Sequence, residues 1–258
     1  MERRIAFEKI ANARDLGGLQ TEDGRRVVPG LLIRCAAPVQ VSAADEKILR
    51  ERYRLAKIID LRTEMERREK PDAVMEGVTY LPNPVFDEST TGISHEAGAD
   101  EAQIGALLPN MEELYRRMVT EETCRRNLGR AARQVMEHDF EQGGVLWHCT
   151  EGKDRCGLLS AVLLLALRVG RGEILEDYLL TNEANGPKAE RYYAQMLAAG
   201  KAEAEAALVR DVFLAQARYL DAAFAVIDGQ YPDGTAFLRE GLGIPAAAAE
   251  RFRESVLR

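Results

Sequence analysis

An apolar strand, a polar turn and an apolar helix follow one another in residues 145–167, and this stretch constrains the fold most. Val145 to His148 is a short apolar run that follows two glycines, which is typical of a buried strand. Residues 158–167 are almost wholly apolar and too long for one strand, so they predict a buried helix. The turn between them contains cysteine, glycine and charged residues, and it is therefore the first place to look for chemistry.

This turn has the features of an anion-binding site. A tight turn from a strand into a helix points successive backbone N–H groups into one concavity, and the helix start adds unpaired N–H groups and the positive end of its dipole. This field is expected to lower the pKa of Cys149 and so to favour its nucleophilic thiolate. Arg155 follows after five intervening residues, and its guanidinium can hold two phosphate oxygens. Together, Cys149 and Arg155 predict the transfer of a phosphoryl group to the cysteine sulfur.

The order His148, Cys149, five residues and Arg155 resembles the signature loop of the protein tyrosine phosphatase superfamily. The run Gly-Lys-Asp-Arg at 152–155 is similar to that of bacterial tyrosine phosphatases with broad specificity, some of which also accept phosphoinositides. Residues 12–18 resemble an N-terminal segment of the same proteins. The resemblance implies a phosphatase fold over the whole chain. The alternative is a cysteine and a basic residue that meet by chance at a strand–helix junction.

The roles predicted for the turn follow from this arrangement. Cys149 is the expected nucleophile, and His148 is expected to order the turn by hydrogen bonding. The backbone amides are expected to hold the equatorial phosphate oxygens, with preorganised donors stabilising the transferring group. The resemblance adds the ammonium group of the lysine as a further phosphate contact. The predicted substrate-binding residues are Thr150, Glu151, Gly152, Lys153, Asp154 and Arg155.

Three aspartates are candidates for the general acid that protonates the leaving group. The resemblance implies Asp154, inside the turn. Asp87, in the segment after residues 78–81, fits the separate acid loop of most tyrosine phosphatases, and Asp60 is the third candidate. Asp154 could instead bridge a neighbouring basic residue within the turn, and Asp60 could instead fix Arg62 or cap the next helix.

Cys156 directly follows the arginine of the turn, where the family has Ser or Thr. The resemblance would bring its sulfur close to that of Cys149. Cys156 is therefore a candidate redox partner that could form a reversible disulfide with an oxidised Cys149. The alternative is a small buried residue that fits where serine would.

The elements predicted along the chain give an α/β fold, with a small, mainly parallel sheet flanked by helices. Strands cluster before residue 150, and the rest is helical. One phosphatase domain is expected over residues 1–258. A helix over 173–184 is expected to end at the Asn-Gly-Pro of residues 185–187, and residues 185–228 form a candidate helical lid insertion or an ordinary surface hairpin. Near the N-terminus, Arg14 and Asp15 are expected to form a structural ion pair in a loop, and the alternative is a direct role in catalysis.

Composition excludes several classes of protein. The net charge of −7 argues against general nucleic-acid binding, and no apolar stretch is long enough to span a membrane. Four cysteines without metal-type spacing and only three histidines predict neither a metal site nor any other cofactor. A cytoplasmic protein is expected, although secretion without a signal peptide stays open, as does the oligomeric state.

The predicted function is hydrolysis of phosphotyrosine, and of other phosphomonoesters, through a phosphocysteine intermediate. The expected partner is therefore a phosphorylated protein or a phosphoinositide. A phosphoinositide or inositol phosphate phosphatase is the alternative within enzymes, because a lysine inside the turn suits a multiply charged head group. A non-catalytic phosphate-binding module and a sulfurtransferase are alternatives of other classes.

Overall fold

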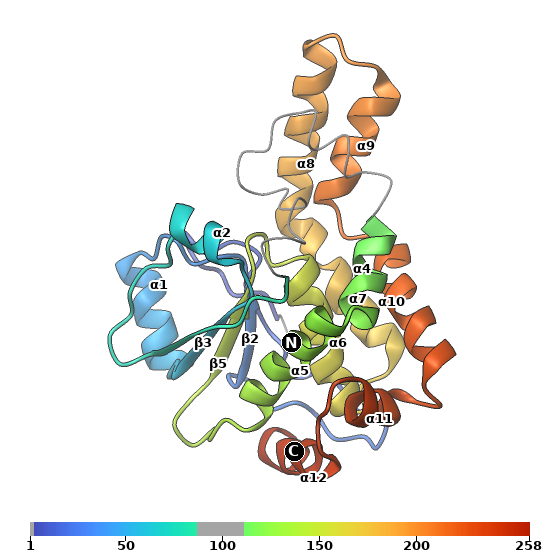
Figure 1. The fold of residues 1–258 in the computed structure, drawn as a ribbon. Coiled ribbons are helices and arrows are strands. Elements are labelled where there is room, and N and C mark those ends of the chain that lie inside the picture. The colour runs from blue at the N-terminus through green and yellow to red at the C-terminus, as the bar shows by residue number, and fades with distance from the viewer. Residues whose placement is uncertain (1–2, 87–110) are drawn as a thin grey trace.

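The computed structural model describes residues 3–86 and 111–258 and shows a sheet beside a larger group of helices (Figure 1). Five strands form the sheet in the order β1-β2-β5-β3-β4. Strand β1 is antiparallel to β2, and every other neighbouring pair is parallel. The predicted α/β fold with a mainly parallel sheet is confirmed. The strands are β1 (Arg14–Asp15), β2 (Leu32–Cys35), β3 (Lys57–Asp60), β4 (Thr79–Pro82) and β5 (Val145–His148).

Alternating side chains of the three central strands fill two separate cores. On β2, Leu32 belongs to the larger core and Ile33 to the smaller one, and on β5 the same division separates Trp147 from Leu146. This period of two is what a strand buried on both faces requires, because successive side chains point to opposite sides. The apolar run that predicted a buried strand therefore reflects two covered faces.

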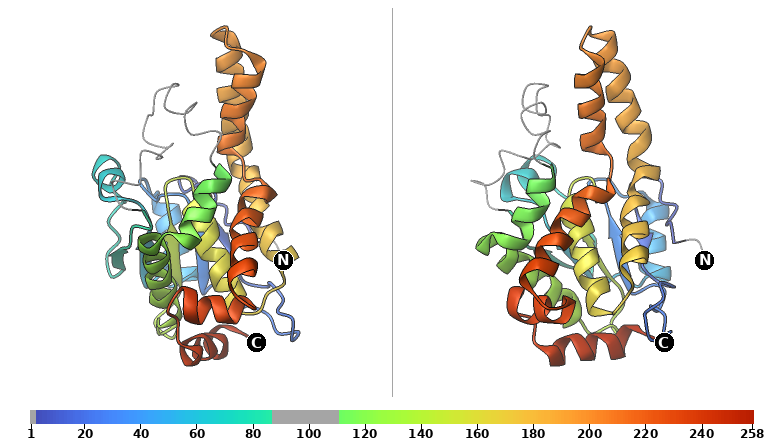
Figure 2. Two further views of the ribbon diagram at one scale, coloured as in Figure 1. Left: turned by 45° about the vertical axis from the view of Figure 1, so that its right-hand side comes forward. Right: turned by 90° about the vertical axis from the view of Figure 1, so that its right-hand side faces the viewer.

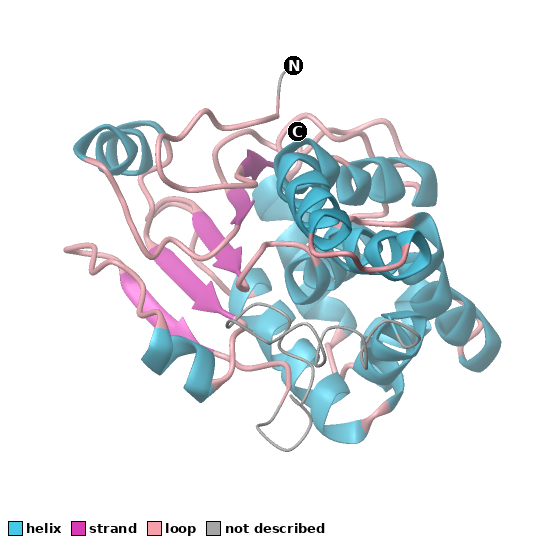
Figure 3. Ribbon diagram, turned by 90° about the horizontal axis from the view of Figure 1, so that it is seen from above, coloured by secondary structure: helices cyan, strands magenta, loops and turns pink. Residues whose placement is uncertain are grey.

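Helices cover the two faces of the sheet unequally, as the view from above shows (Figure 3). The smaller core lies under α1 (Ala43–Lys47), which continues into a π-helical turn at Ile48–Arg52. The larger core is formed mainly with α6 (Asp154–Ala166), the helix predicted after the turn. The remaining helices, apart from the hairpin described next, are α2 (Glu64–Glu69), α4 (Met111–Thr120), α5 (Glu122–Met136), α7 (Arg171–Leu179), α10 (Ala217–Gln230), α11 (Gly234–Ala236) with the π-helical turn Phe237–Gly241, and α12 (Ala246–Val256).

Two long helices, α8 (Thr181–Ala198) and α9 (Glu203–Phe213), form a hairpin that projects from the body in both side views (Figure 2). The hairpin has a small core of its own, to which Met196 and Val209 belong. The expected break at residues 185–187 is wrong, because Pro187 lies inside α8. A proline removes one backbone donor. Packing against α9 and the hydrogen bond from Asn185 Nδ2 to the Phe213 carbonyl oxygen (3.1 Å) offset this loss.

The hairpin contains only part of the insertion predicted over residues 185–228. The segment after α9 returns to the body as α10, which packs against α4. That the hairpin acts as a lid stays a prediction. Within residues 3–86 and 111–258, no helix is both long enough and apolar enough to cross a membrane.

Candidate active site

The turn between β5 and α6 lies at the carboxyl end of the central strand, where an open α/β sheet usually binds its ligand. Cys149 follows the last residue of the strand, and its side chain is 1% exposed. Gly152 has φ +68°, and a Cβ there would lie 2.6 Å from the carbonyl oxygen of Cys35 on β2. Only glycine tolerates both this conformation and this close approach. The glycine therefore brings the turn against the neighbouring strand.

The carbonyl oxygens of the turn are held from outside. Asn12 Nδ2 donates to the carbonyl oxygen of Glu151 (2.9 Å), and Arg34 Nη2 donates to that of Gly152 (2.8 Å). The backbone amides of residues 150–154, in contrast, donate no hydrogen bond within the part of the chain that the structure describes. Buried amides normally have a partner, so this row of free donors is what an anion-binding turn requires.

Arg155 is fixed by Glu66 of α2, a residue that sequence reasoning missed. The guanidinium donates to both carboxylate oxygens, at 2.6 and 2.8 Å. Thr150 Oγ1 donates to the same carboxylate (2.7 Å), and Thr63 N donates to it from the start of α2. Burial alone would raise the pKa of Glu66, but the nearby Arg155 lowers it well below its usual range. The glutamate is therefore an anionic clamp on the arginine of the turn.

A sequence signal for Glu66 was present in the pattern Thr63-Glu64-Met65-Glu66, which is a capping box. The structure contains that box, with reciprocal hydrogen bonds between Thr63 and Glu66. The pattern indicates a helix start, but it does not reveal that the same carboxylate reaches a loop 89 residues away.

Asp154 begins α6 and is 8% exposed. The Tyr115 hydroxyl donates to its Oδ1 at 2.8 Å, and Lys153 Nζ lies 3.4 Å from the same oxygen. Its Oδ2 has no hydrogen-bond partner among the described residues. One carboxylate oxygen is thus held in place by two neighbours.

Lys153 differs from the expectation that its ammonium group faces the phosphate. The side chain is buried, and Nζ donates to the carbonyl oxygens of Val212 and Leu214 at the end of α9. A cation there is favoured because the unpaired carbonyl groups of a helix end are negative. Glu151 also forms an ion pair with Lys188 of α8. The turn is therefore tied to both helices of the hairpin.

Asp60 is not placed to protonate a leaving group. The residue is wholly buried at the end of β3, and its carboxylate accepts hydrogen bonds from Arg62 and the Tyr80 hydroxyl. Burial would raise the pKa of Asp60, yet the nearby His148 and the Arg62 guanidinium lower it. The carboxyl group is therefore held as an anion that fixes Arg62, which was the alternative role predicted for it. Asp87 lies outside the described residues.

His148 and two aspartates form a buried group that has the ligand types of a metal site. Asp60, Asp72 and His148 bring one ligand atom each within 4.8 Å of one another. Arg62, however, donates to both carboxylates at 2.7 Å, so a guanidinium already supplies the positive charge. His148 Nε2 lies 2.8 Å from Asp72 Oδ2, while Nδ1 lies 3.1 Å from the carbonyl oxygen of Cys149. This arrangement orients the backbone next to the nucleophile, as predicted for His148.

The expected ion pair between Arg14 and Asp15 is wrong. Arg14 pairs with Asp177 of α7, which also binds Arg34 at 2.8 Å. Asp15 instead accepts hydrogen bonds from the amides of Gly17 and Gly30. The strand places these neighbours on opposite faces of the sheet, so they cannot pair locally.

Cys156 is wholly buried on α6. Its Sγ lies 3.9 Å from the carbonyl oxygen of Cys35 and 3.7 Å from that of Trp147. Burial raises the pKa of its thiol. No disulfide joins any of the four cysteines in this structure.

A buried cysteine, a clamped guanidinium and amides without an acceptor among the described residues lie together at the end of a parallel strand, as a phosphate-binding site requires. Comparison with known proteins identifies the family. The model of the tyrosine phosphatase family matches residues 5–258, and the chain belongs to this family. It is accordingly a hydrolase of the protein tyrosine phosphatase type.

Two curated relatives cover most of the chain. A protein of Cupriavidus necator named "Putative tyrosine-protein phosphatase" is 32% identical over 249 residues, which are 94% of this chain and 85% of the relative. A triple specificity protein phosphatase of Mycobacterium tuberculosis is 26% identical over 254 residues, which are 89% of this chain and 91% of the relative.

Proposed function

We propose that the protein hydrolyses phosphotyrosine through a phosphocysteine intermediate. The observation that carries this proposal is the turn itself, which begins at the buried Cys149, has amides that donate no hydrogen bond among the described residues, and ends at the clamped Arg155. Cys149 attacks phosphorus as a thiolate. A sulfur–phosphorus bond forms, and the bond between phosphorus and the tyrosine oxygen breaks. The amides and Arg155 stabilise the charge on the equatorial oxygens. Water then releases phosphate and restores the thiolate.

Glu66 supports this role for Arg155. A free arginine side chain would have to be ordered at each turnover, whereas a guanidinium held at both nitrogens is positioned before substrate binds. The Thr150 hydroxyl also donates to the Glu66 carboxylate, so the same clamp holds both the arginine and the start of the turn. The clamp therefore favours catalysis over passive phosphate binding.

Asp154 is the proposed general acid. The support is its place at the first residue of α6, the hydrogen bond from Tyr115, and an Oδ2 that accepts no hydrogen bond from the described residues. A proton on Oδ2 would pass to the leaving oxygen as the phosphorus–oxygen bond breaks. Asp87 remains the second candidate.

The α8–α9 hairpin is proposed to control access to the turn. Lys153 and Lys188 connect the turn to the two helices, so a displacement of the hairpin would release both contacts. The same displacement would free the Lys153 ammonium group to approach a multiply charged substrate. Release of Lys153 in this way keeps phosphoinositide hydrolysis as the second candidate function. The proposed place of action is the cytoplasm, where reducing conditions keep the nucleophile as a thiol.

Hydrolysis of three substrate types tests the proposed function. The purified protein and its Cys149→Ser variant are assayed with a phosphotyrosine peptide, a phosphoserine peptide of the same sequence and a phosphoinositide. We expect the phosphotyrosine peptide to be hydrolysed with the highest kcat/KM, and the variant to bind it without turnover. Preference for the phosphoinositide would favour the second candidate, and binding of all three without hydrolysis would favour a non-catalytic module.

A further inference from the structure

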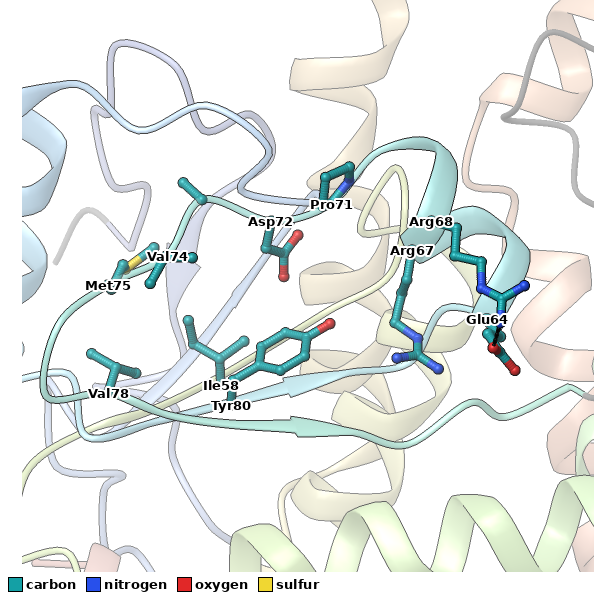
Figure 4. Close-up of a pocket in the computed structure, with 11 residues that line it drawn as sticks. Ile58, Glu64, Arg67, Arg68, Pro71, Asp72, Val74, Met75, Val78 and Tyr80 are labelled. Atoms are coloured by element: carbon teal, nitrogen blue, oxygen red, sulfur yellow. Dashed lines mark hydrogen bonds and ion pairs between the residues drawn. The ribbon is translucent and has the colours of Figure 1, made fainter.

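A pocket of about 440 Å³ lies beside the catalytic turn but does not include it (Figure 4). The pocket is bounded by α2, by the chain that follows this helix and by strands β3 and β4. Its volume is within the range of small-molecule sites, which is about 300–1,000 Å³. None of residues 149–155 lines it, so the pocket is distinct from the site proposed for phosphate.

One end of the pocket is apolar. Val74, Met75 and Val78 lie together at this end, and Ile58 lies beside the Tyr80 ring along the strands (Figure 4). Val74 is fully exposed, and together with Met75 and Val78 it makes this end of the pocket apolar. An alkyl chain in the pocket would remove these surfaces from water.

The other end of the pocket is cationic because of one arginine. Arg67 extends from α2 toward the strands (Figure 4), and its Nε is buried without a hydrogen-bond partner among the described residues. Its neighbour Arg68, in contrast, forms an ion pair with Glu64. No carboxylate pairs with the Arg67 guanidinium within the described residues, so a ligand anion that reached its Nη atoms would form charge-assisted hydrogen bonds there.

Each acidic residue of the pocket lining has a basic neighbour. Asp72 accepts a hydrogen bond from Arg62 at 2.7 Å and lies 2.8 Å from His148, and Glu64 is paired with Arg68. Arg67 thus contributes the one charge of the lining that has no opposite partner within the described part of the chain. The pocket therefore fits a ligand with one negative charge at one end and an apolar body.

We propose that this pocket binds an amphipathic monoanion of the alkyl carboxylate class. The carboxylate accepts hydrogen bonds from Arg67, and the alkyl chain lies along Ile58 and Tyr80 toward Met75 and Val78. The charge-assisted hydrogen bonds orient the ligand, while burial of its chain supplies most of the affinity. The proposal does not depend on the proposed catalytic function, because it concerns binding alone.

Calorimetric titration with decanoate, below its micelle concentration, tests the proposal on the full chain. The wild type is expected to bind one decanoate saturably, and to do so equally with inorganic phosphate present at saturation. Arg67→Gln is expected to weaken binding about tenfold or more, which is typical for losing hydrogen bonds to a charged group. Arg68→Gln is the matched control and should change the dissociation constant by less than about twofold, as expected for an exposed pair.

Two further arms separate specific binding from adsorption of a surfactant. Decanol, which lacks the charge, should bind more weakly than decanoate, and Val78→Glu should abolish binding by placing a carboxylate at the apolar end. Thermal unfolding verifies that each variant is folded. Lack of saturable binding by the wild type would overturn the proposal. Equal losses in the two arginine variants, or displacement of decanoate by phosphate, would also overturn it.

Discussion

Asp177→Asn tests how strongly the buried charges beneath the turn hold the fold. Asp177 lies on α7, and its carboxylate binds Arg3 (2.7 Å), Arg14 (3.1 Å) and Arg34 (2.8 Å). These contacts join the N-terminal segment, β1 and β2 to one helix, and Arg34 in turn holds the carbonyl oxygen of Gly152. Burial alone would raise the pKa of Asp177, but the three arginines lower it to about 2.

The expected loss of stability follows from this geometry. The difference between the ordinary aspartate pKa of 3.8 and a folded-state pKa of about 2 corresponds to roughly 2 kcal/mol in favour of the ionised folded form. Asparagine also leaves Arg14 and Arg34 buried without their carboxylate, and breaking a buried pair typically costs about 3–5 kcal/mol. We therefore expect Asp177→Asn to lower the free energy of unfolding by about 3–5 kcal/mol at pH 7.

The stability difference between the wild type and Asp177→Asn should depend on pH in a defined direction. The folded-state pKa of Asp177 lies below its unfolded-state pKa. The contribution of the ionised carboxylate to the free energy of unfolding is therefore complete above the unfolded-state pKa, and it is lost as the pH falls from about 4 toward 2. The wild type should therefore lose stability between about pH 4 and pH 2, whereas Asp177→Asn, which lacks this carboxylate, should not show that part of the loss. The difference between the two proteins should narrow below pH 4.

Urea unfolding followed by circular dichroism at pH 7, 5, 4 and 3 measures these free energies. Glu46→Gln is the control, since Glu46 pairs with Arg50 at an exposed site and should cost less than about 1 kcal/mol. A variant within about 1 kcal/mol of the wild type at pH 7 would refute the reasoning. A difference that does not change with pH would refute it as well.

Three further predictions concern the site. Glu66→Gln should lower kcat on the order of tenfold to a hundredfold, because a loosened Arg155 is misplaced, whereas steady-state kinetics of the control Glu64→Gln should match the wild type. Asp154→Asn should lower turnover most for esters with poor leaving groups and flatten the basic limb of the pH–rate profile; that pattern in Asp87→Asn alone would move the acid to the other segment. Cys156→Ser should hydrolyse its phosphoenzyme faster, because a hydroxyl is a stronger hydrogen-bond donor than a thiol. After treatment with peroxide and then a reductant, the variant should recover less activity than the wild type, and equal recovery in the variant and the wild type would exclude a protective disulfide.

The sequence predicted the parts of the fold that depend on local pattern. The strand at 145–148, the helix behind the turn and the glycine at 152 were all predictable, because periodicity and a positive φ leave a direct signature. The clamp by Glu66 was not predictable, since the capping box of α2 explains the same residue without any distant contact.

Contacts between distant segments account for the remaining differences. Asp177 and Arg14 are 163 residues apart, so local reasoning paired Arg14 with its neighbour instead. The contact between Lys153 and the end of α9 depends on where the hairpin packs, and its sequence indicates helices without indicating their direction. Pro187 predicted a helix end, but tertiary hydrogen bonds preserved the helix.

A single-turnover experiment tests the central claim most directly. The protein is mixed with a phosphotyrosine peptide, denatured at neutral pH within milliseconds, digested and examined by mass spectrometry. The proposed mechanism predicts phosphate on Cys149, formed with the burst of released tyrosine peptide and absent from Cys149→Ser. Release of phosphate without any phosphorylated Cys149, or phosphate found on His148 instead, would contradict the mechanism.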